Sequence, residues 1–88
     1  MKEKNSFYIL RDKESGEFVY EDVGFSFQGG DIELCRVDNP HKAWQEGHVQ
    51  QTFDIAMYEK ECIESRYNVD VEVVHMLQKF AYKELEKF

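Results

Sequence analysis

The fold of this chain depends on residues 67–77, which read YNVDVEVVHML. Val69, Val71 and Val73 alternate with acidic residues, and this spacing is typical of a half-buried strand. The same segment continues into residues 74–81, whose apolar positions have the spacing of one helix face. The choice decides whether Asp70, Glu72 and His75 come together as a site or are scattered by a helix. Both structures have to be weighed against the local capping signals.

Those capping signals favour the helix. Asn68 suits the left-handed residue that ends a preceding helix. With Asp70 as N-cap, Val69 and Val74 would form a hydrophobic staple, and Glu72 would complement the helix dipole. The predicted helix runs to the end of the chain, with an apolar stripe of Val74, Leu77, Ala81, Leu85 and Phe88. In this interpretation the stretch is scaffold, because its acidic residues serve a helix start.

The first 37 residues have the pattern of short antiparallel strands. Residues 7–11 and 18–20 are β-prone, and the turn DKESG between them offers Gly16 for a positive φ angle. QGGD at 28–31 predicts a second turn before a strand at 32–37. The segment 23–27 contains Gly24 and is the least regular part. We therefore expect a meander of three or four strands.

From residue 38 onward, the local sequence signals favour a helix instead of strands and turns. Asp38 or Asn39 can cap a short helix that begins at Pro40 and stops before Gly47. Trp44 in this helix is either a core residue or an exposed anchor for a partner, and the core position is favoured.

From His48 a longer apolar stripe follows, formed by Val49, Phe53, Ala56, Met57, Ile63 and Tyr67. A strand at 52–57 competes with it, but the length and the helix-favouring composition of the segment predict a helix. The fold class is therefore α+β in one domain, residues 1–88. An N-terminal antiparallel β-meander of three to four strands packs against two C-terminal α-helices, with a short intervening helix.

The charge balance is the most unusual global property of the chain. It has 18 acidic and 11 basic residues, for a net charge of −7. Residues 12–38 hold eight acidic and two basic residues, and residues 54–72 hold six and two. A field of this sign repels nucleic acid and anionic membranes, and it attracts basic protein surfaces. We therefore expect neither direct nucleic-acid binding nor membrane binding.

Residues with catalytic or metal-binding chemistry lack the necessary spacing. The histidines and cysteines show no close pairs such as C-x-x-C, which structural zinc sites require; they are His41, His48, His75, Cys35 and Cys62. Cys62 lies among glutamates, which disfavour a thiolate nucleophile. We therefore expect no metal, no cofactor and no enzymatic activity. Two widely spaced cysteines and no export signal lead us to expect a cytoplasmic protein.

The sequence thus favours a function in binding another protein. In size and charge the chain resembles the small acidic inhibitors of phages and mobile elements, including anti-CRISPR and anti-restriction proteins. We expect a partner with a basic surface, such as a nuclease or another nucleic-acid-binding protein. The candidate contact residues are Glu14, Glu17, Glu21, Asp22, Asp31, Glu33, Glu59, Glu61 and Glu64. The alternative is a structural or assembly protein that homodimerises through its C-terminal helix, with acidic residues serving solubility.

Overall fold

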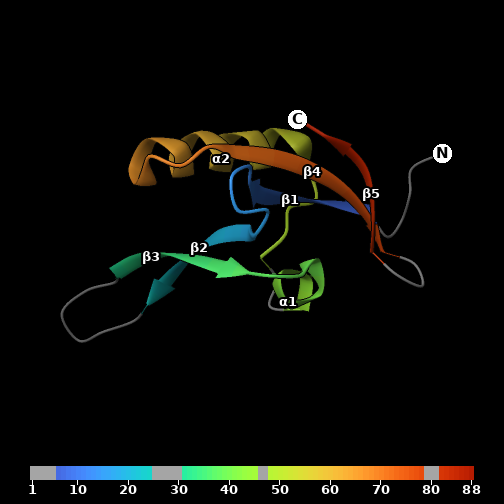
Figure 1. The fold of residues 1–88 in the computed structure, drawn as a ribbon, viewed down its shortest axis with the longest axis horizontal. Helices are drawn as coiled ribbons and strands as arrows, with labels where there is room; N and C mark the ends of the chain where they lie inside the picture. Colours follow the sequence, from blue (N-terminus) through green and yellow to red (C-terminus); the bar gives the residue numbers. More distant parts are fainter. Residues whose placement is uncertain (1–5, 25–30, 46–47, 79–81) are drawn as a thin grey trace.

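Five strands in the described part of the chain form one antiparallel sheet, and helices cover its two faces (Figure 1). The computed structural model describes residues 6–24, 31–45, 48–78 and 82–88. The elements are β1 (Ser6–Asp12), β2 (Phe18–Gly24), β3 (Asp31–Val37), α1 (Pro40–Gln45), α2 (Phe53–Tyr67), β4 (Val71–Gln78) and β5 (Tyr82–Lys87). The strand order is β3-β2-β1-β4-β5. The α+β class is therefore confirmed, with more strands than the sequence predicted.

The N-terminal strands follow the predicted meander. Gly16 has a φ of 77°, the left-handed conformation that closes the turn between β1 and β2. β2 then pairs with β3 from Phe18↔Val37 to Gly24↔Asp31. The predicted irregular segment at 25–27 and the turn at 28–30 lie outside the described residues.

The short helix α1 begins where the sequence predicted. Pro40 is its first residue, and the Asn39 side chain accepts a hydrogen bond from the Lys42 N–H at 3.1 Å. Asn39 is therefore the capping residue. Ala43 of α1 is fully buried, whereas its neighbour Trp44 is 41% exposed. The expectation that Trp44 belongs to the core is wrong, because the smaller neighbour supplies the contact with the sheet.

The long helix α2 is shorter at its start than predicted. It begins at Phe53, because residues 48–50 are extended and Gln50 pairs with Tyr8 of β1. The predicted end is confirmed: Asn68 has a φ of 54° and donates its N–H to the Glu64 carbonyl. Ala56 and Ile63 are the buried residues of α2.

The predicted helix over residues 70–88 is wrong. This segment forms β4 and β5, so Asp70 is not an N-cap; its carbonyl accepts a hydrogen bond from the Lys13 N–H at 2.9 Å. β4 pairs along its length with β1, and Val71 and Val73 pack beneath α2 while Val74 and Met76 fill the other face. A central strand with both faces buried carries apolar residues at odd and even positions, which imitates a helical stripe.

The core consists of two clusters separated by the sheet. One holds Phe7, Ile9, Phe18, Ala43, Val74 and Met76, on the side of α1. The other holds Leu10, Val19, Ala56, Ile63, Val71 and Val73, on the side of α2. The C-terminal helix on which the homodimer hypothesis rested does not exist. None of the described helices is long and apolar enough to span a bilayer.

Candidate functional site

The acidic segments 12–38 and 54–72 meet where β2 separates from β1. The paired positions of these strands are Leu10↔Val19 and Arg11↔Phe18. Further along β1, Tyr8 pairs with Gln50 instead, through backbone hydrogen bonds of 2.7 and 2.8 Å. The segment 48–50 thereby lies beside the distal half of β2, with α2 over both. This departure from a regular sheet creates a cavity.

The cavity has a volume of about 90 Å³. Its lining residues come from β2, from the segment 48–50 and from α2; they are Tyr20, Glu21, His48, Gln50, Glu59 and Ile63. Ile63 is buried, and the others are half-buried and hence reachable from solvent. The rings of Tyr20 and His48 stack with centroids 3.8 Å apart and an angle of 9° between their planes. The cavity thus combines two carboxylates, an amide and a stacked aromatic pair.

Glu59 is the carboxylate in this cavity that forms no ion pair with a lysine or arginine of the described residues. It accepts a hydrogen bond from the Gln50 side-chain amide at 2.7 Å, and the His48 imidazole lies close enough to interact with its charge. Burial raises the pKa of the Glu59 carboxyl above its ordinary value; the bond from Gln50 opposes this, Glu21 adds to it, and the charge of His48 opposes it. The charged form of Glu59 is therefore less stable here than in water.

Glu21 differs from Glu59, because it is neutralised. Arg66 of α2 forms an ion pair and hydrogen bond with it, and the Tyr67 hydroxyl donates to the same oxygen at 3.2 Å. This pair ties β2 to the end of α2. The bond to Glu21 holds the Arg66 guanidinium in its charged form, so its pKa is raised. With a neutral His48 imidazole, Glu59 and the Glu21–Arg66 ion pair give the cavity a net charge of −1.

Two further predicted contact residues have structural partners. Glu64 accepts hydrogen bonds from Lys60 at 2.9 Å and from the Val71 N–H at 3.1 Å, and so joins α2 to β4. Burial would raise the pKa of Glu64, but these two bonds outweigh it and the pKa is lowered. Glu17 lies 3.8 Å from Arg36. These carboxylates are already compensated within the fold.

Four predicted contact residues remain exposed, and the side chain of Asp31 lies outside the described part of the structure. Asp22 and Glu33 are opposite each other across β2 and β3, so their side chains project on the same face. Glu14 lies in the β1–β2 turn, and Glu61 lies on the outer surface of α2. The ion pairs of the described residues include none of these four. The nine predicted residues therefore do not form one face.

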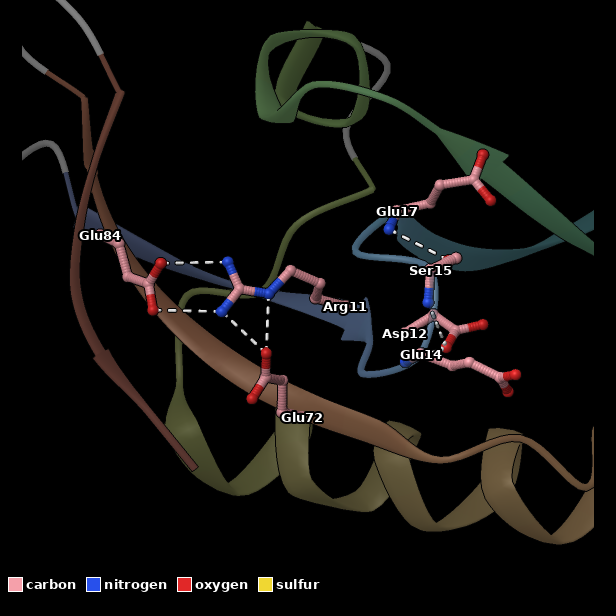
Figure 2. A network of polar contacts seen from close by, with 7 residues as sticks. All are labelled: Arg11, Asp12, Glu14, Ser15, Glu17, Glu72 and Glu84. Atoms are coloured by element: carbon pink, nitrogen blue, oxygen red, sulfur yellow. Dashed lines mark hydrogen bonds and ion pairs between the residues drawn. The ribbon is translucent and has the colours of Figure 1, made fainter.

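The remaining polar network is structural. Figure 2 shows Arg11 between Glu72 and Glu84, with bonds of 2.7 Å to the first and 3.0 and 3.1 Å to the second. Because these residues lie on β1, β4 and β5, the network holds three strands together. Glu72 therefore pairs across the sheet with Arg11 and does not complement a helix dipole, which corrects the sequence-based expectation.

Sequence reasoning did not identify Tyr20, His48 or Gln50 as site residues. They became neighbours only because residues 48–50 pair with β1, a contact that no local motif signals. In the described part of the chain, no three side chains of the ligand types His, Cys, Asp and Glu are placed to hold a metal ion.

Comparisons with known proteins supply no analogy for this arrangement. No protein-family model, curated protein or solved structure matches the chain. The function is therefore inferred from the geometry and charge described above.

Proposed function

We propose that this chain is a non-enzymatic protein-binding module that occupies a basic surface of a partner protein. The observation that carries the proposal is the pair Asp22 and Glu33, directly opposite each other on β2 and β3. Like charges in this arrangement destabilise a sheet. No cation of the described chain pairs with either residue, so the fold retains a repulsion that a basic partner would relieve.

The proposal extends to the kind of partner. Carboxylates on a rigid β-ribbon can replace phosphates, so a nucleic-acid-binding surface is the favoured target. Size and charge support a further hypothesis, an inhibitor of the phage or mobile-element anti-defence type. If this is right, duplex DNA competes with the chain for its partner.

A pull-down from host extract with matched charge variants tests the proposal. The double variant Asp22→Asn/Glu33→Gln removes two charges while keeping side-chain shape. The control Asp54→Asn/Glu86→Gln removes the same number at exposed positions outside the predicted contact residues. We expect the wild type and the control to retain a basic protein at low salt and to release it at about 0.5 M salt, because screening shortens the range of the attraction.

The first double variant should lose that partner and stay folded, since removing a like-charge pair does not weaken the sheet. Capture that is equal for both double variants, or that is insensitive to salt, would contradict the proposal. Circular dichroism of each variant separates loss of binding from loss of structure.

A further inference from the structure

We infer that the cavity between β2, residues 48–50 and α2 binds the guanidinium group of an arginine side chain supplied by the partner. The source of the guanidinium rests on the proposed function. The preference for a flat cation rests on the cavity itself, and it is tested without any partner. Asp22 and Glu33 would then provide general attraction, while the cavity would select one residue of the partner.

The charge of the cavity favours binding of one cation. Glu21 is already paired with Arg66, whereas Glu59 has the neutral amide of Gln50 and the His48 imidazole as neighbours. At pH 8, where imidazoles are ordinarily neutral, an entering cation would therefore find a single uncompensated carboxylate. An anion such as phosphate would face that carboxylate with no opposing cation, so it is disfavoured.

The shape and chemistry of the walls favour guanidinium over ammonium. The parallel rings of Tyr20 and His48 present flat π-systems beside Glu59. A guanidinium is planar, stacks on aromatic rings and is more weakly hydrated than an ammonium, so it loses less on entering a half-buried site. Its forked donors can bond to the Glu59 carboxylate and the Gln50 amide oxygen together. The volume of about 90 Å³ accommodates such a head group but not a large ligand.

A titration of the isolated protein with methylguanidinium tests this site. We would follow the Gln50 side-chain amide by ¹H–¹⁵N NMR at pH 8, where carboxylates are ionised and imidazoles are ordinarily neutral. Chloride is held constant, and methylammonium and urea serve as comparison probes. We expect a saturable shift with a millimolar midpoint for methylguanidinium, binding at least threefold weaker for methylammonium, and no saturation with urea, its neutral planar analogue.

Two matched variants test whether methylguanidinium binds in this cavity. Glu59→Gln keeps the acceptor for Gln50 but removes the charge, and it should weaken methylguanidinium binding at least tenfold. Glu86→Gln removes the same charge from exposed β5 and should leave binding unchanged. A drift that does not saturate, or a midpoint that is equal in the wild type and Glu59→Gln, would overturn the cavity as a cation site.

Capture of the partner by Glu59→Gln separates this inference from the proposed function. If the partner binds the wild type in a salt-sensitive way, Glu59→Gln should reduce its affinity about tenfold. Unchanged affinity would refute an arginine in the cavity and leave the proposed function standing. Loss of capture by Asp22→Asn/Glu33→Gln, measured in parallel, reports on the function alone.

Discussion

The Asp12 side chain offers the sharpest test of how the β1–β2 turn is held. Asp12 is 6% exposed, and one of its oxygens accepts the N–H groups of Glu14 at 2.8 Å and Ser15 at 3.3 Å (Figure 2). Its other oxygen accepts a hydrogen bond from Arg36 of β3 at 2.6 Å. The substitution Asp12→Ala removes all three bonds at once.

The three hydrogen bonds of Asp12 set the expected loss of stability in Asp12→Ala. A hydrogen bond contributes about 0.5–1.5 kcal/mol, and one to a charged group about 1.5–3 kcal/mol. Because the Arg36 side chain is 35% exposed, solvent screening reduces its share towards about 1 kcal/mol. Asp12→Ala should therefore lower the free energy of unfolding by about 2–3 kcal/mol. For a domain of this size, that corresponds to a fall in Tm of roughly 8–24 °C.

Two companion variants separate the contributions. Asp12→Asn keeps an acceptor for the two backbone N–H groups and loses the charge facing Arg36, so we expect a cost of about 1 kcal/mol. Asp22→Ala is the matched control, because it is exposed and faces Glu33; it should change stability by less than about 0.5 kcal/mol. Urea denaturation followed by circular dichroism measures all three differences.

The stability contributed by the Asp12 carboxylate should decrease as the pH falls. The hydrogen bond from Arg36 holds the pKa of Asp12 below its ordinary value. A carboxyl with a lowered folded-state pKa stabilises the protein above its unfolded-state pKa and loses that contribution as the pH falls. The difference between wild type and Asp12→Asn should thus shrink below about pH 4. A cost of Asp12→Ala no larger than that of Asp22→Ala, or a difference unaffected by acid, would refute this account of the turn.

Three further predictions concern the core, the turn and the cavity. Val74→Ala, at a fully buried position of β4, should cost about 2–3 kcal/mol in urea denaturation; a cost below about 0.5 kcal/mol would contradict the two-sided burial of that strand. Gly16→Ala should cost about 1 kcal/mol from its positive φ angle alone, since no atom lies within 4 Å of the added Cβ, and Gly16→Asn should cost less. Glu59→Gln should raise Tm at pH 8, because wild type loses stability as the pH rises through the raised pKa of Glu59; an unchanged or lower Tm would show that burial does not disfavour its charge.

The sequence by itself determined the elements that local chemistry specifies. The Gly16 turn, a cap at Asp38 or Asn39 before Pro40 and the left-handed Asn68 were all predicted, because each depends on a few neighbouring residues. The strands at the N-terminus followed from the same kind of signal. The net charge and its two acidic segments were likewise evident without a structure.

Only the tertiary structure decided between strand and helix for YNVDVEVVHML. Val73 lies opposite Leu10 of β1, a pairing across 63 positions of sequence that outweighs the local capping signals. The tertiary structure also decided which acidic side chains are paired with an arginine. Glu21 is neutralised by Arg66 and Glu59 is not, although both belong to the same kind of acidic segment. The physical reason is that charge compensation and strand pairing depend on contacts between distant residues, which no local pattern records.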